Sequence, residues 1–246
     1  VRLRIWNNPV DYHSSFEEVS LFSQKLKNMG LKVWISVHYS DTWADPGSQV
    51  PPSNWQDLPF SILKDSMSRY TEKIMTKINP DYIQIGNEIN PGILLPYGNI
   101  NSNEAQFIDL ITSGVEAVRN NSSETKIIIH YAGIDGSEWF FNKLKSVDYD
   151  IMGLSYYPIW HGEDLVKLKT TITNLVISND KEIIIAETAY PFTLGWNDWT
   201  NNIVGLEDQL ILPDYPATSI GQKEFIFKIR DIMESTHRQH NQRAGA

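Results

Sequence analysis

Cysteine is absent from the 246 residues of this chain. The chain can therefore form neither a disulfide framework nor a thiolate metal site, although this leaves its cellular compartment open. Long apolar runs are missing as well. The longest, such as Ile183–Ala186, is far shorter than the ~20 residues of a membrane-spanning helix. No basic-then-apolar signal segment opens the sequence, because residue 1 already lies in a predicted strand.

Basic residues are also fewer than acidic ones. Lys and Arg number 21 against 30 Asp and Glu, which gives a formal net charge of −9. An acidic surface repels phosphate groups, so neither nucleic acid nor a membrane is expected as a partner. Hydrophobic residues make up 41% and charged residues 21% of the chain, a balance typical of folded proteins and unlike that of disordered ones.

Aromatic residues, by contrast, are abundant. The chain has eight Trp and 11 Tyr, and many of them stand beside polar residues in predicted loops. The apolar C–H faces of sugar rings stack on aromatic side chains, so loop aromatics would suit a sugar-binding cleft. Burial in the core with a polar tip at the surface explains them equally well. Composition alone leaves both interpretations open.

Short β-branched apolar runs alternate with longer amphipathic stretches along the chain. The predicted strands are Val1–Trp6, Leu31–Val37, Tyr82–Gly86, Lys126–His130, Asp150–Leu154 and Glu182–Ala186. The predicted helices are Phe16–Met29, Ile62–Ile78, Glu104–Asn120, Glu138–Leu144, Asp164–Ile177 and Gly221–Glu234. Gly30 is expected to cap the first helix. Successive β-then-α units predict a parallel sheet, either doubly wound or closed as a (β/α)8 barrel.

The polar residues at the strand ends distinguish these two folds. No glycine-rich phosphate motif follows a predicted strand, which disfavours a nucleotide-binding sheet. Polar and aromatic residues follow the strands instead, at Trp6–Asn8, His38–Asp41, Asn87–Glu88, His130–Tyr131, Ser155–Tyr157 and Glu187–Thr188. Functional side chains at the C-terminal ends of strands are typical of a barrel active site. We predict an α/β fold of the (β/α)8 TIM-barrel family, with a single catalytic domain over residues 1–246.

Two glutamates differ from the other acidic residues by their position. Glu88 ends the segment Tyr82–Glu88 and Glu187 ends Ile183–Glu187, so each carboxylate directly follows an apolar strand. Two carboxylates across a barrel mouth can divide the acid/base and nucleophile roles of glycosidic bond cleavage. Each could instead cap a helix or pair with an arginine. The presence of two such glutamates, one of them preceded by Asn87, favours catalysis.

Longer motifs extend this interpretation. Gly86-Asn87-Glu88, together with Glu187, resembles the clan A retaining glycosidases. More specifically, the chain resembles glycoside hydrolase family 53, the arabinogalactan endo-β-1,4-galactanases, in the segments Arg2–Asn7, His38–Gln49, Leu154–Gly162, Glu187–Pro191 and Tyr215–Thr218. These motifs span almost the whole chain. The resemblance implies a secreted galactanase and places Glu88 after the fourth barrel strand and Glu187 after the seventh.

The resemblance also implies roles for individual residues. Glu88 matches the general acid/base and Glu187 the nucleophile of a double-displacement mechanism. Asn87 matches an asparagine that binds the sugar 2-hydroxyl, and Arg4 an arginine that supports the nucleophile. The other residues expected to bind substrate are His38, Asp41, Trp43, His130, Tyr156, Trp160 and His161. Trp43 and Asp45 share one motif, in which the sequence does not separate cleft residues from structural ones.

A metal or other cofactor is not expected. His38, His130 and His161 come from separate loops and lack the i,i+4 spacing of a zinc site. His38 could equally be a buried core histidine. A structural calcium is possible but is not indicated, because no calcium-loop signature accompanies its candidate ligands, which are Asp45, Asp198 and Asp214.

The number of strands fits this barrel only in part. If Glu88 follows strand four, then Val1–Trp6 is strand two, so strands two to seven are present and the first and eighth βα units are missing. Strands two and seven would then have open edges, through which copies of the chain could associate. The chain is predicted to be an incomplete barrel, and its catalytic residues do not by themselves show that it is active.

Three functions are compatible with these residues. The first is an endo-acting retaining hydrolase of β-1,4-galactan in the type I arabinogalactan side chains of pectin. The second is a clan A glycosidase for another β-1,4-linked polysaccharide, such as mannan. The third is a catalytically inactive remnant that binds galactan. Because such polymers lie outside cells, we expect a secreted, cell-surface or periplasmic protein whose signal segment is not in this sequence.

Overall fold

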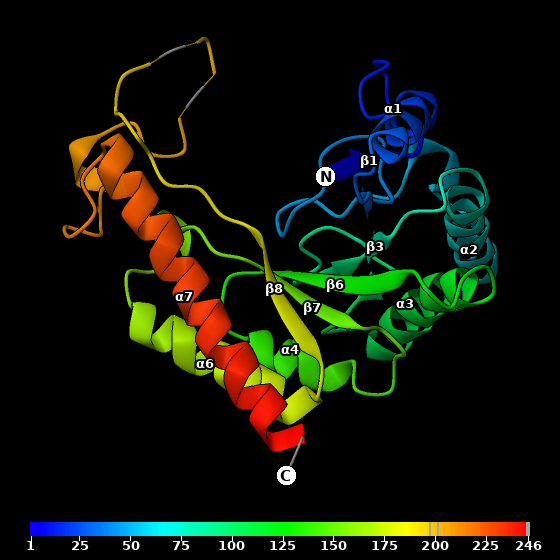
Figure 1. The fold of residues 1–246 in the computed structure, drawn as a ribbon. Helices are drawn as coiled ribbons and strands as arrows, with labels where there is room; N and C mark the ends of the chain where they lie inside the picture. Colours follow the sequence, from blue (N-terminus) through cyan, green and yellow to red (C-terminus); the bar gives the residue numbers. More distant parts are fainter. Residues whose placement is uncertain (197, 201, 245–246) are drawn as a thin grey trace. The chain divides into compact units, whose positions relative to one another are not determined.

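The computed structural model describes residues 1–196, 198–200 and 202–244. Strands and helices alternate along the chain (Figure 1). The chain forms two compact units: unit 1 comprises residues 1–132 and 144–152, and unit 2 comprises residues 133–143 and 153–246. The strands of the main sheet follow the order β1-β2-β3-β6-β7-β8, and the boundary between the units falls within β7 (Ile151–Ser155).

Unit 1 contains four parallel strands of this sheet, which are β1 (Arg2–Ile5), β2 (Trp34–Val37), β3 (Tyr82–Ile85) and β6 (Lys126–Ala132). The register aligns Arg4 with Ser36 and Ser36 with Gln84. Successive side chains of a strand point to opposite faces, so these three polar residues form a row on one face. The parallel pairing and the alternating helices confirm the predicted α/β class.

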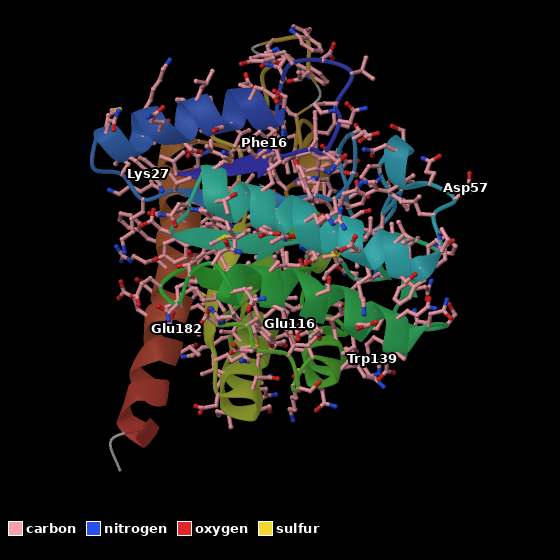
Figure 2. All side chains as sticks on the ribbon, turned by 90° about the vertical axis from the view of Figure 1, so that its right-hand side faces the viewer. Phe16, Lys27, Asp57, Glu116, Trp139 and Glu182 are labelled. Atoms are coloured by element: carbon pink, nitrogen blue, oxygen red, sulfur yellow. The ribbon has the colours of Figure 1, made fainter. Side chains whose placement is uncertain are left out.

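The helices of unit 1 are α1 (Phe16–Asn28), α2 (Phe60–Lys77) and α3 (Glu104–Arg119). Figure 2 shows them side by side, and α2 packs closely against α3. Both helices bury apolar side chains completely, among them Leu63 and Met67 of α2 and Phe107 and Leu110 of α3. Each such side chain contributes about 1.5–3 kcal/mol when it leaves water, so this burial stabilises unit 1.

The end of α1 explains why β2 begins three residues later than predicted. Gly30 has φ +77°, and its N–H donates to the Lys27 carbonyl, while the Leu31 N–H donates to the Leu26 carbonyl. This is a Schellman cap, which confirms the expected role of Gly30. Because Leu31 completes the helix cap, it cannot join the sheet, and regular pairing starts at Trp34.

Unit 2 contains α4 (Ser137–Lys143), α5 (Pro158–His161), α6 (Leu165–Asn179), β8 (Glu182–Glu187) and α7 (Ser219–Ala244). Helix α6 packs against both α4 and α7. It begins at Asp164, whose Oδ1 accepts hydrogen bonds from the N–H groups of Val166 at 2.9 Å and Lys167 at 2.8 Å. The helix predicted at Gly221–Glu234 begins earlier and continues to Ala244.

Several short elements were not predicted. These are the two-residue strands β4 (Gly92–Ile93) and β5 (Gly98–Asn99), the helix α5, and the 3-10 turns η1 (Ser53–Trp55) and η2 (Glu207–Gln209). Segments this short have no periodicity from which to predict them. No helix in the described part of the chain combines the length and the apolar character needed to cross a membrane. The single domain and the missing first and eighth βα units stay predictions.

Candidate active-site residues

The turn after β3 carries Asn87 and Glu88 in unit 1. Gly86 has φ +81° and Glu88 has φ +49°, so two residues of this turn adopt left-handed backbone conformations. A Cβ atom at Gly86 would lie 2.5 Å from Ile89 Cγ2, which explains the glycine. The Glu88 side chain is nearly buried, with 8% of its surface exposed. The turn therefore fixes a carboxyl group at the C-terminal end of a central strand.

Asn87 is fully buried and is held at both ends of its amide. Its Oδ1 accepts hydrogen bonds from Arg2 Nη2 at 2.9 Å and from Gln84 Nε2 at 3.1 Å, and its Nδ2 donates to the Ala44 carbonyl at 2.9 Å. These partners fix which end of the amide is oxygen, because a reversed amide would point N–H groups at a guanidinium. The sugar 2-hydroxyl contact implied for Asn87 stays a prediction.

His130 lies on β6, directly against the backbone of Glu88. Its Nδ1 accepts from the Glu88 N–H at 3.3 Å and from Gln84 Nε2 at 3.0 Å. Burial lowers the pKa of His130 well below its usual value, and the positive charge of Arg2 adds to the effect. His130 is therefore neutral, with its proton on Nε2. Its Nδ1 holds the turn, and the predicted substrate contact remains untested.

His38 follows β2 and is also a buried, neutral histidine. Its Nδ1 accepts from the Ala44 N–H at 3.0 Å, which leaves the ring proton on Nε2. Burial, with Arg2 and Arg4 nearby, lowers the pKa of His38 to about 3. Its ring meets the edge of Trp43 at a centroid distance of 5.2 Å. His38 is buried, as the alternative interpretation of a core histidine predicts. The role of His38 in substrate binding stays a prediction.

Arg4 and Trp43 line a cavity of about 730 Å³ in unit 1. The Arg4 guanidinium lies 5.1 Å from the ring centres of both Trp6 and Trp43, and its Nε donates to Ser14 Oγ at 3.1 Å. Trp43 remains 41% exposed, so part of its ring face is open to a ligand. These contacts fix Arg4 within unit 1. Its predicted support of Glu187 is not tested by them.

The two aspartates of the loop after β2 hold loops in place. Asp41 Oδ1 accepts from the Asn8 N–H at 3.0 Å, while its Oδ2 accepts from the N–H and hydroxyl of Ser53 at 2.8 and 2.6 Å. Asp45 Oδ1 accepts from the Gly47 N–H at 2.7 Å and closes its own turn. Both oxygens of Asp41 are thus engaged in a bracing role that the sequence did not reveal. Its substrate contact stays a prediction.

Glu187 is the last residue of β8, in unit 2. Tyr157 Oη donates to Glu187 Oε2 at 3.1 Å, and the Tyr156 N–H donates to the Glu187 carbonyl at 2.8 Å. The segment after β7 therefore holds both the backbone and the carboxylate of Glu187. Trp160 packs edge-on against Tyr157 at a centroid distance of 5.0 Å and is 61% exposed, as a sugar-stacking residue would be.

Tyr156 and His161 stabilise the short helix α5. Tyr156 is fully buried, and its hydroxyl donates to the Gly162 carbonyl at 2.7 Å. Burial and then the charge of Asp164 raise the pKa of Tyr156 to about 12, so it remains a donor at any physiological pH. His161 Nδ1 accepts from the Tyr157 N–H at 2.9 Å, and burial lowers the pKa of this histidine. These contacts of both side chains are structural, and their predicted substrate contacts stay untested.

Two of the three candidate ligands for a structural calcium, Asp45 and Asp198, close turns of their own. Asp45 binds the Gly47 N–H, and Asp198 Oδ1 accepts from the N–H and hydroxyl of Thr200 at 2.8 and 2.6 Å. Such short turns satisfy a carboxylate oxygen without an ion. The expectation that the chain needs neither a calcium ion nor a cofactor stays a prediction.

Sequence reasoning missed several residues that contact the predicted ones, namely Arg2, Ser36, Gln49, Gln84 and Tyr157. For three of them a signal was available. Arg2, Ser36 and Gln84 are polar residues within apolar strands. Arg2 and Ser36 lie two residues before Arg4 and His38, and Gln84 interrupts the apolar strand that precedes Asn87. In a strand, that spacing places them on the same face as the functional residues. No local pattern distinguishes Gln49 or Tyr157.

Comparisons with known proteins support the family resemblance that the sequence motifs indicate. A model of glycosyl hydrolase family 53 matches residues 1–244. An uncharacterized protein encoded in the bgaB 5′ region of Niallia circulans is 36% identical over 250 residues, 95% of this chain and 68% of that protein. An arabinogalactan endo-beta-1,4-galactanase from Cellvibrio japonicus is 32% identical, and the match covers 96% of this chain and 66% of that enzyme. The chain thus spans about two thirds of these relatives.

A solved structure shows the same likeness. The family 53 catalytic domain from Ignisphaera aggregans superposes with a TM-score of 0.90 at 33% sequence identity, over 97% of this chain and 71% of that one. The chain therefore shares its fold and a third of its residues with a domain of this family.

Proposed function

The chain belongs to glycosyl hydrolase family 53, and on that premise we propose that it is an endo-acting, retaining β-1,4-galactanase. Membership confirms the predicted family, its glycosidase class and the TIM-barrel-like α/β fold. The observation that carries the proposal is the family match over residues 1–244, which includes a glutamate at the C-terminal end of β3 and another at the end of β8.

The proposed reaction is a double displacement. Ionised Glu187 attacks the anomeric carbon, while protonated Glu88 gives its proton to the departing glycosidic oxygen. The sugar is then joined to Glu187 through an ester bond. Glu88, now ionised, takes a proton from water as the water attacks the same carbon, which releases the sugar and restores both carboxyl groups. The residues that form hydrogen bonds with each glutamate would keep the two carboxyl groups in the positions that these steps require.

We propose β-1,4-galactan, such as the type I arabinogalactan side chains of pectin, as the substrate. The name of the Cellvibrio japonicus relative supports this choice, since that enzyme is an arabinogalactan endo-β-1,4-galactanase. The half-exposed rings of Trp43 and Trp160 offer apolar faces for sugar rings. A polymer of this kind lies outside cells, so we also propose an extracellular or cell-surface location, to be tested by fractionation of the source cells.

The test is the release of reducing sugar from potato or lupin galactan, with mannan and xylan in parallel and Glu187→Gln as the control. We expect the wild type to act on galactan, to leave mannan and xylan intact, and to lose its activity in the variant. Preference for mannan would favour another clan A glycosidase. Retardation of the protein in a galactan-containing gel without release of sugar would instead identify a binding protein that has lost catalysis.

The stereochemical outcome is tested separately. If the mechanism is a double displacement, the first reducing ends released from galactan are β anomers, since two inversions restore the starting configuration. Proton NMR of the anomeric region during the first minutes detects them before mutarotation. The appearance of α anomers first would exclude the covalent intermediate on Glu187.

Retention of activity after dialysis against EDTA would support a reaction that needs no metal.

A further inference from the structure

The turn that carries Glu88 adopts a backbone conformation that glutamate does not favour. Its φ of +49° lies in the left-handed region, where the Cβ atom of an L-residue crowds the following carbonyl. Such a conformation persists only when its surroundings hold it, and it is often found at functional sites. The peptide groups on either side of Glu88 therefore need fixed hydrogen-bond partners.

Gln49 supplies such partners from a distant loop. Its side chain is buried, with 3% of its surface exposed. Its Nε2 donates to the Asn87 carbonyl at 2.8 Å and to the Glu88 carbonyl at 3.3 Å, which are the carbonyls before and after the Glu88 Cα. One amide nitrogen thus contacts both peptide groups that set the φ and ψ of Glu88.

The loop around Gln49 fixes this amide in turn. The same Nε2 donates to the Asp45 carbonyl at 3.0 Å, and the Gln49 carbonyl accepts from the Leu95 N–H at 2.8 Å. Asp45 and Ser48 form a β-bridge around Pro46 and Gly47. The segment Asp45–Gln49, which ends the sequence motif His38–Gln49, is a closed turn that presents the Gln49 amide to the base of the Glu88 turn.

We infer that Gln49 is a positioning residue for Glu88, an inference that rests on the proposed role of Glu88 as the acid/base. If Gln49 is removed, the two carbonyls lose their shared donor, and Glu88 can relax toward the right-handed region. A change in φ swings the Cα–Cβ bond and moves the carboxyl group away from the glycosidic oxygen. Displacement by about 1 Å can cost on the order of 100-fold in rate.

The residue type matches this role. The glutamine amide brings one N–H donor group to both carbonyls. Gln49→Glu would set a carboxylate oxygen against carbonyl oxygens, and Gln49→Asn would withdraw the donor by one methylene. Gln49→Leu keeps most of the side-chain volume and removes the donor, so it is the most direct test.

The experiment compares two substrates that differ in their need for an acid. Galactan has a poor leaving group and needs the proton from Glu88, whereas 2,4-dinitrophenyl β-1,4-galactobioside has a good leaving group and does not. For Gln49→Leu we expect kcat/KM to fall about 100-fold on galactan, and less than about tenfold on the aryl substrate. If the variant differed from the wild type only in having less folded protein, its apparent kcat/KM would fall by the same factor on both substrates.

The matched control is Gln56→Leu. Gln56 is exposed and also donates its side-chain amide to a carbonyl, that of Pro51 at 3.4 Å, in the same loop region. It is expected to keep wild-type values on both substrates. Equal losses on both substrates in Gln49→Leu, or no loss on galactan, would overturn the inference. An inactive wild type on both substrates would instead refute the proposed function.

A second measurement does not depend on activity. A crystal structure of Gln49→Leu, or of Gln49→Met if the first variant does not fold, is expected to show Glu88 outside the left-handed region with its carboxyl group displaced. A Glu88 that keeps its φ near the wild-type value and its carboxyl position would contradict a positioning role for Gln49, whatever the kinetics show.

Discussion

The two candidate catalytic glutamates follow strands of the same parallel type, but their backbones are held in different ways. Glu88 lies three residues beyond the end of β3, in a left-handed turn braced by Gln49 and His130. Glu187 is itself the last residue of β8, and its backbone stays in the extended conformation of the strand. A hydrogen bond from Tyr157 Oη reaches its carboxylate.

The backbone of Glu88 depends on distant residues more than the backbone of Glu187 does. The partners of Glu88 come from loops and strands that are 39 and 42 residues away in sequence, and they act mainly on its backbone. The strand ladder already sets the backbone of Glu187, so its neighbours need only orient the side chain. Substitutions around Glu88 should therefore move a backbone, whereas those around Glu187 should change one contact.

The largest effect is expected for Glu187→Ala. Loss of a nucleophile removes the covalent pathway and should lower kcat on galactan by about 10⁴-fold or more. Azide can enter the space left by the carboxylate and attack the anomeric carbon from the same face, so it should restore turnover on the aryl galactobioside. Product NMR should then show an α-glycosyl azide. A β-azide would mean that the two glutamates have the opposite roles.

Glu88→Ala should have a smaller and substrate-dependent effect. General acid catalysis contributes about 10²- to 10⁴-fold, so kcat on galactan should fall within that range. The aryl substrate should still form the covalent intermediate rapidly. Azide should then intercept that intermediate and give a β-glycosyl azide, the opposite anomer from Glu187→Ala. Equal losses of kcat on galactan and on the aryl substrate would show that Glu88 does not act as the general acid.

Tyr157→Phe tests the side-chain contact at Glu187. A hydrogen bond to a charged acceptor is worth about 1.5–3 kcal/mol, which corresponds to about a 10- to 100-fold decrease in kcat. Tyr190→Phe is the matched control in unit 2, because Tyr190 Oη donates to the Tyr215 carbonyl at 2.6 Å. That variant should lose about 1 kcal/mol of stability and keep its kcat. Equal kcat values for both variants would show that Tyr157 does not act on the nucleophile.

The smallest effect concerns His38, the buried histidine that follows β2. The pKa of His38 is about 3 in the folded chain and about 6.5 when unfolded, so the unfolded chain binds the extra proton. Its stabilising contribution is complete above pH 6.5 and is lost as the pH falls toward 3. Between pH 7.5 and 5.5 the loss from this histidine should be about 1 kcal/mol.

His38→Asn provides the comparison, because asparagine keeps an acceptor near the position of Nδ1 and does not titrate. Urea unfolding at pH 7.5 and 5.5 should show that the wild type loses about 1 kcal/mol more than the variant over this interval. An identical pH dependence in the two proteins would show that the histidine is not held neutral in the folded state.

Much of the fold followed from the sequence. All six predicted strands and six predicted helices have counterparts in the structure, because apolar periodicity and glycine caps are local properties. The exceptions have local physical causes. Strand β2 begins late because Leu31 completes the cap of α1, and the hairpin β4–β5 is too short to have a period.

The amino-acid sequence alone identifies the two glutamates, the asparagine before the first and the family of the chain, because strand-end positions and contiguous motifs can be read along one chain. Three features became apparent only in the folded chain: Arg2 holds Asn87, His38 and His130 are neutral, and Gln49 supports the Glu88 turn. Those contacts join residues tens of positions apart. They depend on strand register and loop path, which no local pattern encodes, and on burial, which exists only once the chain has folded.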